Sequence, residues 1–252
     1  AGALGLATAE ALLERGDSVT VLGRGLVGQE SAWAGGGIRC LLCPWDYPEE
    51  VTRLTCRSAA EFSAWTAALQ AASGIDPEYE RSGMLVLPPF DAVAAQQWCK
   101  AHAVPLQLLE VADILPAGAG QALLLPEVAQ VRNPRLVQAL RQQVLALGGR
   151  IVEQCAVQGL LTEKGRVRAL ATSCGEQRAE RYIVTAGAWS REVLGPYALQ
   201  LDIRPIRGQM LLFKFETPPL RHIVLQDSLY LIPRCDGHVL VGSTLEDAGF
   251  DK

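Results

Sequence analysis

The chain opens with Ala1-Gly2-Ala3-Leu4-Gly5-Leu6-Ala7 and continues past Gly16 to the apolar stretch Ser18-Val19-Thr20-Val21-Leu22. The first apolar residues recur at helical spacing, Gly16 is a typical helix stop, and the β-branched stretch indicates a buried strand. Gly2 and Gly5 have the spacing of the second and third glycines of G-x-G-x-x-G. The second of these lets a pyrophosphate approach the helix N-terminus, and the third lets helix and strand pack closely. The sequence therefore predicts part of a dinucleotide-binding βαβ unit.

Two features depart from the usual form of that unit. The first glycine and the strand that carries it are absent, so we expect the natural protein to begin about ten residues earlier. Gly23 stands at the strand end, where an Asp or Glu usually holds the adenosine ribose. The nearest acid, Glu30, lies beyond the strand end. This departure weakens the expectation of tight cofactor binding but leaves the fold prediction unchanged.

The segment Ser31-Ala32-Trp33-Ala34-Gly35-Gly36-Gly37-Ile38 gives the sharpest functional signal. Three consecutive glycines form neither a good helix nor a good strand. They suit a backbone that lies flat against a large planar ligand and offers N–H groups without side-chain bulk. The alternative is a flexible linker, although linkers seldom carry residues such as Trp33 and Ile38 at either side. We therefore interpret the segment as a ligand-binding loop.

Composition sets the broad class of the protein. The 252 residues are 49% hydrophobic and 20% charged, which is an ordinary balance for a globular protein. A net charge of −4 argues against nucleic-acid and anionic-membrane partners. The sequence shows neither a long uninterrupted apolar run nor a basic region typical of a signal peptide. Seven scattered cysteines suggest a reducing compartment, so we expect a cytoplasmic protein without a membrane span.

A metal site is not predicted. Cys40-Leu-Leu-Cys43 is the only CxxC pair, and zinc would need two further ligands nearby. The three histidines lie far away in the sequence, at His102, His222 and His238. Zinc or redox chemistry at this pair remains an alternative, but ordinary apolar packing is the favoured interpretation.

Periodicity and capping signals predict the remaining elements. Helices are expected over residues 49–72, 91–102 and 133–147, the last with Asn133 as N-cap and Pro134 as first helical residue. Trp98 and Cys99 are expected in the core. Strands are expected at residues 83–87, 151–152, 166–172 and 182–185, and antiparallel strands from residue 204 onward, with a turn at residues 235–238.

Six stretches together carry a family resemblance: Gly2-Ala3-Leu4-Gly5-Leu6-Ala7; Ser31 to Ile38 with Pro44-Trp45-Asp46-Tyr47-Pro48; Thr185-Ala186-Gly187-Ala188-Trp189-Ser190; Pro205-Ile206-Arg207-Gly208-Gln209; Tyr230-Leu231-Ile232-Pro233-Arg234; and Val241-Gly242-Ser243-Thr244. With these, the chain resembles the D-amino-acid oxidase family of FAD-dependent oxidoreductases, in its glycine oxidase branch of the thiamine-pathway type. The resemblance covers essentially the whole chain.

The resemblance implies an α/β fold, α+β overall. A Rossmann-like FAD-binding domain would comprise residues 1–80 and 151–200. It would be interleaved with an antiparallel-sheet substrate domain, comprising residues 81–150 and 201–252. Members of the family continue well past the position of Lys252, to an arginine that grips the substrate carboxylate. The chain is therefore expected to be truncated at both ends, without its principal substrate anchor.

The resemblance also implies the cofactor FAD and the residues that bind it. The implied cofactor-binding residues are Gly2, Ala3, Gly5, Arg24, Ser31, Ala34, Gly35, Gly36, Gly37, Ile38, Val157, Thr185, Ala186, Gly187 and Trp189. Val157 would contact the adenine, and Tyr230 would orient the substrate, its alternative being a half-buried strand aromatic. Arg207 and Arg234 are conceivable anchors, yet arginines at strand ends are usually solvated or paired at the surface.

The implied reaction is FAD-dependent oxidation of glycine or another small primary or secondary amine. Its products would be hydrogen peroxide and an imine that hydrolyses to glyoxylate or serves thiazole synthesis for thiamine. The implied partners are the small amine and oxygen, and a homo-oligomer is possible. Two alternatives stay open: a flavin dehydrogenase that uses another electron acceptor, and a catalytically silent fragment. A nicotinamide dehydrogenase is disfavoured, because it gives the triple-glycine loop no role.

Overall fold

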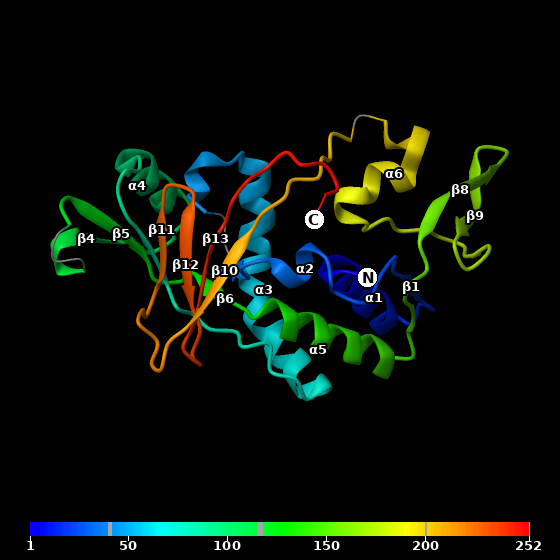
Figure 1. Ribbon diagram of the computed structural model, residues 1–252, viewed down its shortest axis with the longest axis horizontal. Helices are drawn as coiled ribbons and strands as arrows, with labels where there is room; N and C mark the ends of the chain where they lie inside the picture. Colours follow the sequence, from blue (N-terminus) through cyan, green and yellow to red (C-terminus); the bar gives the residue numbers. More distant parts are fainter. Residues whose placement is uncertain (40–41, 115–117, 200, 252) are drawn as a thin grey trace.

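The computed structural model describes residues 1–39, 42–114, 118–199 and 201–251. The molecule is elongated, with a seven-stranded sheet at one end, a β-hairpin at the other and long helices between them (Figure 1). This mixture of helices and sheets confirms the predicted fold class. Within the described part of the chain, every helix is too short or too polar to span a bilayer.

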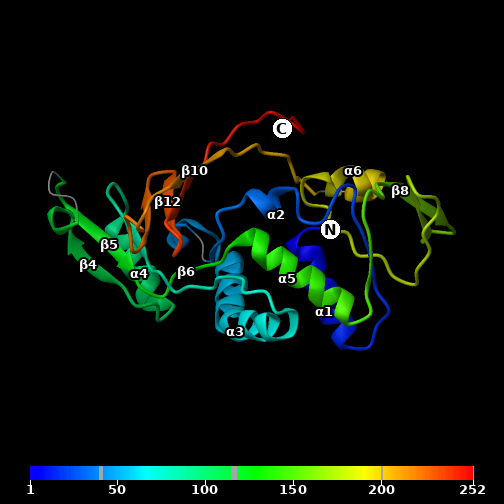
Figure 2. The ribbon, with the colours of Figure 1, turned by 60° about the horizontal axis from the view of Figure 1, so that its bottom comes forward.

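Three helices form the middle layer: α1 (Ala3–Glu14), α3 (Glu49–Ser73) and α5 (Asn133–Ala146). Figure 2 shows α5 lying across α1 and α3. Their apolar faces share one core cluster, in which Leu6 of α1 and Leu140 of α5 are fully buried. This packing stabilises helices whose own propensities would be insufficient.

The helix ends follow the local sequence signals. Gly16 adopts a left-handed conformation (φ +88°) just after α1, and Gly74 ends α3 in the same region (φ +70°). The side chain of Asp91 caps α4 (Ala92–Ala101) by accepting hydrogen bonds from the N–H groups of Val93 and Ala94. All three predicted long helices are therefore confirmed. Trp98 and Cys99, on α4, pack in the core of the large sheet as expected.

The seven-stranded sheet draws its strands from two distant parts of the chain. In spatial order these are β10 (Met210–Lys214), β13 (His238–Gly242), β12 (Leu229–Pro233), β11 (Ile223–Gln226), β3 (Met84–Val86), β5 (Gln121–Leu125) and β4 (Gln107–Glu110). Neighbours are antiparallel except β3 and β11, which are parallel. The predicted interleaving of early and late segments is thus present, with one parallel pair that was not predicted.

Two of the small sheets lie outside the seven-stranded sheet. Strand β1 (Thr20–Leu22) pairs in parallel with β7 (Arg150–Val152), and β8 (Val157–Glu163) forms a hairpin with β9 (Arg166–Thr172). The predicted strand at residues 182–185 is wrong. Those residues lie outside any strand, because β1 and β7 pair with each other and no other described strand reaches this segment.

Short elements connect these layers: α2 (Ser31–Ala34), β2 (Ile38–Arg39), β6 (Ala129–Gln130), α6 (Ser190–Leu194), and four 3-10 turns at Pro44–Asp46, Val111–Asp113, Gly187–Trp189 and Gly195–Ala198. The domain division at residues 80, 150 and 200 stays a prediction. The contacts of α5 with α1 and α3 favour a boundary ahead of α5 rather than at residue 150.

The CxxC pair is only partly described. Cys40 lies outside the described residues, and the half-buried Cys43 packs against the core of the large sheet. Among the described residues, no cluster of three or more His, Cys, Asp or Glu side chains could hold a metal ion.

Candidate cofactor site

The N-terminus of α1 is open. Gly2 is the N-cap residue, no side chain caps the helix, and the first turn carries no acidic residue. The first N–H groups of a helix lack partners within it and carry a partial positive charge. A Cβ built on Gly2 would meet only the Cβ of Ala32, at 3.9 Å, which is an ordinary contact. The space and the charge at this helix end therefore fit a pyrophosphate.

Gly5, one turn further along α1, packs closely against Thr185. A Cβ at Gly5 would lie 2.8 Å from Oγ1 of Thr185, too close for an unmoved neighbour. The sequence predicts that this glycine lets the helix pack closely against a strand. The close packing is present, but the residue that packs on Gly5 lies outside any strand. This contact places the segment Thr185–Gly187 beside the open end of α1.

Gly23, at the expected ribose position, connects β1 to the β8–β9 hairpin. Its N–H donates to the carbonyl of Val152 (2.9 Å), and its carbonyl accepts from the N–H of Cys155 (2.8 Å). The half-buried Val157 follows two residues later, so it lies close to the end of β1. Glu30, the nearest acid in sequence, accepts a hydrogen bond from Nη2 of Arg24 (2.9 Å).

Arg24 and Trp189 contact each other. The guanidinium carbon of Arg24 lies 3.8 Å from the centroid of the Trp189 ring, a cation–π arrangement. Trp189 also stacks on Phe250, with centroids 5.3 Å apart and planes inclined by 26°. Sequence reasoning assigned both Arg24 and Trp189 to the cofactor but missed their contact, because no local pattern relates residues so far apart.

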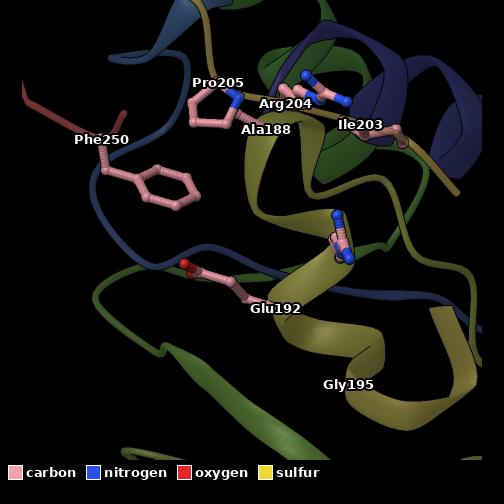
Figure 3. Close-up of a pocket in the computed structure, with 8 residues that line it drawn as sticks. Ala188, Glu192, Gly195, Ile203, Arg204, Pro205 and Phe250 are labelled. Carbon is pink, nitrogen blue, oxygen red and sulfur yellow. The ribbon is translucent and has the colours of Figure 1, made fainter. Parts of the chain in front are cut away.

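A hollow of about 350 Å³ adjoins this stack, over α6 (Figure 3). Its lining includes Arg191, Glu192, Arg204 and Phe250. None of the triple-glycine residues lines this hollow, so it is not the flavin position that the sequence predicts.

The outer two glycines of the loop are required by the start of α5. A Cβ on Gly35 would lie 2.8 Å from Nδ2 of Asn133, and a Cβ on Gly37 (φ +74°) would lie 2.1 Å from the carbonyl oxygen of Val131. Asn133 was predicted to be the N-cap of α5, but Arg132 occupies that position and Asn133 is the first residue of the helix. Its side-chain amide instead donates to the carbonyl of Gly35 (3.0 Å), which ties the loop to the helix.

The middle glycine faces the large sheet. A Cβ on Gly36 would lie 2.5 Å from Cδ1 of Ile232, 3.3 Å from Cε2 of Tyr230 and 3.6 Å from Cε of Met210. The backbone of the loop therefore packs so closely on β12 and β10 that no side chain would fit at Gly36. Contacts within the protein are thus one reason for the three glycines. The planar ligand that the sequence predicts would be a second reason, and its contact with the loop stays a prediction.

Arg234 links the triple-glycine loop to the segment that follows β6. It is 5% exposed, and its guanidinium donates to Oε1 of Gln130 (2.7 Å) and to the carbonyls of Val131 (3.0 Å) and Gly36 (2.8 Å). The expectation of a solvated or surface-paired Arg234 is wrong, because these long-range acceptors bind its two terminal nitrogens, while its buried Nε has no partner among the described residues. Arg207 is paired as expected, with Glu246 (2.5 Å) and Asp251 (3.1 Å).

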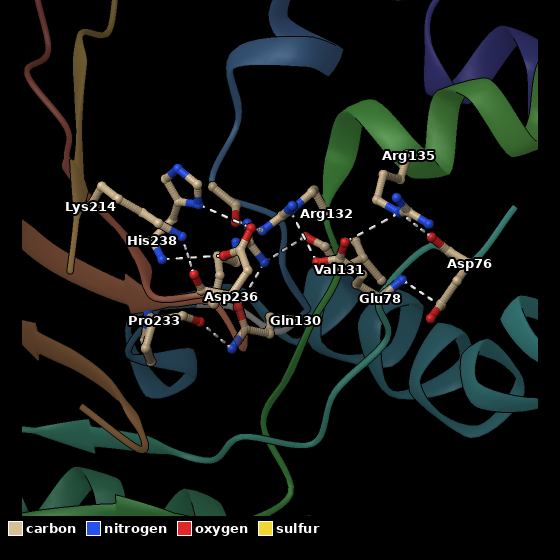
Figure 4. A network of polar contacts seen from close by, with 12 residues as sticks. Asp76, Glu78, Gln130, Val131, Arg132, Arg135, Lys214, Pro233, Asp236 and His238 are labelled. Atoms are coloured by element: carbon tan, nitrogen blue, oxygen red, sulfur yellow. Dashed lines mark hydrogen bonds and ion pairs between the residues drawn. The ribbon is translucent and has the colours of Figure 1, made fainter. Parts of the chain in front are cut away.

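An ion-pair network beside Arg234 joins the start of α5 to the turn after β12 (Figure 4). Arg132 bridges Glu78 (3.0 Å) and Asp236 (2.9 Å), and Asp236 also contacts His238 (3.0 Å). His238, in the predicted turn at residues 235–238, therefore belongs to this network. Burial, and then the nearby Arg132, lower the pKa of Arg234 to about 10, so it stays protonated at neutral pH. Burial raises the pKa of Asp236, but hydrogen bonds from Arg132 and His238 outweigh this and hold it well below its usual range.

Comparison with known proteins decides which cofactor these features serve. The family model described as FAD dependent oxidoreductase (DAO) matches residues 1–252. The chain belongs to this FAD-dependent oxidoreductase family. FAD is therefore its cofactor, and the protein is an oxidoreductase.

The chain is also similar to individual curated proteins and solved structures. The glycine oxidase of Pseudomonas aeruginosa is 41% identical over 259 residues, which cover 100% of this chain and 71% of the relative. The bifunctional protein ThiO/ThiG of Trichormus variabilis is 31% identical, covering 99% of this chain and 39% of the relative. Among solved structures, the glycine oxidase of Bacillus cereus superposes with a TM-score of 0.90 at 22% identity, covering 99% of this chain and 70% of that structure.

The residues present fit FAD. The open end of α1 suits the pyrophosphate, and the end of β1 with Val157 lies where the adenosine half is expected. The triple-glycine loop lies between this region and the strand that carries Tyr230. Helix α2, with Ser31 and Ala34, packs on α5, and Ile38 pairs with Gln130. The individual FAD contacts of these residues remain predictions.

We predict that Gly2→Asp separates FAD binding from folding. An Asp at the N-cap position is at least as good a helix cap as glycine, so the stability of the FAD-free protein should be unchanged or slightly increased. Its negative charge would repel the pyrophosphate, and FAD affinity should fall about tenfold or more. Titration of the FAD-free protein by flavin fluorescence measures this. Gly2→Ala adds a Cβ without a charge and should weaken binding less, and an FAD affinity of Gly2→Asp equal to that of the unaltered protein would contradict the placement.

Proposed function

We propose that the protein oxidises glycine or another small primary or secondary amine, and that oxygen is the final electron acceptor. The products are hydrogen peroxide and an imine, which hydrolyses to glyoxylate or is used for thiazole synthesis in thiamine formation. The glycine oxidase and ThiO/ThiG relatives support this substrate class. We further propose a cytoplasmic location, which the free thiols of the described cysteines favour.

The observation that carries the proposal is the contact between Tyr230 and the triple-glycine loop. The Tyr230 ring lies 3.3 Å from the position that a Cβ of Gly36 would occupy. Tyr230 is half-buried on β12, so a phenol hydroxyl is available beside the loop proposed to bind the flavin. A substrate held by that hydroxyl would lie next to the cofactor.

We assign the following roles to the protein. When bound, FAD supplies the hydride acceptor for the α-carbon of the amine. The hydroxyl of Tyr230 donates a hydrogen bond to the substrate carboxylate and fixes the substrate's orientation. The close packing of Ile232, Met210 and Tyr230 under Gly36 excludes water from one side of the loop.

Tyr230→Phe tests this role. Removal of one hydrogen bond to a charged carboxylate should raise KM for glycine about tenfold or more, with a smaller change in kcat and an unchanged flavin spectrum. Tyr197→Phe is the matched control, because the hydroxyl of Tyr197 is exposed and donates to Thr162 (3.1 Å) away from the loop. Steady-state oxygen uptake with glycine measures both variants. The same KM for Tyr230→Phe and the unaltered protein would refute the assignment.

Oxygen consumption also separates an oxidase from a dehydrogenase. An oxidase should consume oxygen and produce hydrogen peroxide in equal amounts when glycine is added. If glycine reduces the flavin but air reoxidises it only slowly, while an artificial electron acceptor restores turnover, the protein is a dehydrogenase instead.

A further inference from the structure

Two cysteines face each other at the base of the β8–β9 hairpin. The antiparallel register pairs Val157 with Thr172, and the N–H of Ser173 donates to the carbonyl of Ala156 (2.9 Å). Cys155 and Cys174 lie just beyond this last backbone contact of the hairpin. Cys174 is in the turn over residues 172–175, in which the N–H of Gly175 donates to the carbonyl of Thr172 (3.1 Å).

Thr172 orients both cysteines. Its hydroxyl oxygen accepts from the thiol of Cys155 (3.3 Å) and from the N–H of Cys174 (3.2 Å). The sulfur of Cys174 lies 3.8 Å from the carbonyl oxygen of Gln154, the residue before Cys155. These contacts gather the two cysteines around one hydroxyl group, an arrangement from which a disulfide can close.

The two thiols differ in their environments. Cys155 is fully buried, whereas Cys174 is exposed and can meet a soluble oxidant. Burial raises the pKa of Cys155, but its contacts with Thr172 and Cys174 outweigh this and lower the pKa overall, whereas the contact with Cys155 raises the pKa of Cys174. Exposure makes Cys174 the thiol that a soluble oxidant reaches, and the lowered pKa makes Cys155 the attacking thiol.

We propose that Cys155 and Cys174 are a redox modification site that closes reversibly to a cross-strand disulfide under peroxide. Hydrogen peroxide oxidises the Cys174 thiol to a sulfenic acid and is reduced to water. The Cys155 sulfur attacks the sulfenic sulfur, the S–S bond forms, and the S–O bond breaks. The hydroxyl leaves with the Cys155 proton as a second water. A dithiol reductant reverses the change.

The site lies beside the proposed adenosine half of the FAD site. The N–H of Cys155 donates to the carbonyl of Gly23 (2.8 Å), and Val157 is two residues away. A disulfide would fix the segment that joins β1 to the hairpin, and closing this loop should raise the thermal midpoint by several degrees. This inference uses the family's cofactor but does not depend on the amine that the protein oxidises.

Peptide mapping of the FAD-bound protein tests the proposal. After treatment with added hydrogen peroxide, we expect one disulfide-linked peptide joining residues 155 and 174, lost on reduction and absent in Cys174→Ser. The thermal midpoint should rise by several degrees with oxidation, and Cys174→Ser should remove this rise. Cys56→Ser, which removes an exposed thiol on α3, should keep both effects.

Two results would overturn the proposal. One is oxidation of Cys174 to sulfinic acid, or its pairing with another chain, while Cys155 stays free in folded protein. The other is formation of the linked peptide only after unfolding. Because the peroxide is added, a protein inactive toward glycine would still give a clear result.

Discussion

Replacement of Arg234 by methionine is expected to destabilise the protein by about 3–5 kcal/mol and to release most of its FAD. Methionine keeps much of the apolar stem but removes the guanidinium. The acceptors left behind are Oε1 of Gln130 and the carbonyls of Val131 and Gly36, in a region where Arg234 itself is only 5% exposed. Each buried acceptor without a partner costs about 1–3 kcal/mol.

The loss should also change cofactor binding, because Arg234 is bonded to the triple-glycine loop itself. Urea unfolding of the FAD-free protein measures stability, and flavin retained after gel filtration measures binding. Arg204→Met is the matched control: it removes an exposed arginine paired only with Asp202, so the unfolding midpoint should not move. Equal midpoints for Arg234→Met and Arg204→Met would contradict the structural role of Arg234.

Gly37→Ala is the second substitution with a large expected effect. The new Cβ would lie 2.1 Å from the carbonyl oxygen of Val131, in a backbone conformation (φ +74°) that disfavours any side chain. The left-handed conformation alone costs about 1–2 kcal/mol. The clash adds to this cost, because the backbone of Val131, between β6 and α5, would have to move. We expect a total destabilisation of about 3–5 kcal/mol, with loss of FAD.

Gly165→Ala is the control that isolates the clash. Gly165 has nearly the same conformation (φ +75°), but a Cβ there would meet no atom within 4 Å. Its destabilisation should therefore be that of the conformation alone, about 1–2 kcal/mol. If Gly37→Ala costs no more than Gly165→Ala in urea unfolding, and flavin binding is retained, the close approach of the loop to α5 is wrong.

Much of the local structure could be predicted from the sequence, because its signals are local. The Gly2–Gly5 spacing marks the start of α1, Asp91 caps α4, and Gly74 ends α3. The family resemblance supplied the interleaving of the two halves, which periodicity alone does not show.

The contacts between distant residues could not be predicted in this way. Nothing near Arg234 in the sequence indicates a partner at Gly36, 198 residues away, and the same holds for the contact of Arg24 with Trp189. The Cys155–Cys174 pair emerges only once the β8–β9 hairpin is formed, because the hairpin brings both residues to Thr172. The sequence of residues 182–185 fits a strand, but a strand also needs a neighbour to pair with.

The visible absorption spectrum of the purified protein, recorded before and after anaerobic addition of glycine, tests the central claim most directly. We predict flavin absorption bands that glycine bleaches in the absence of oxygen and that return with hydrogen peroxide when air is admitted. A protein that stays colourless after incubation with FAD, or whose flavin bands are unaffected by glycine and other small amines, would contradict the proposed function.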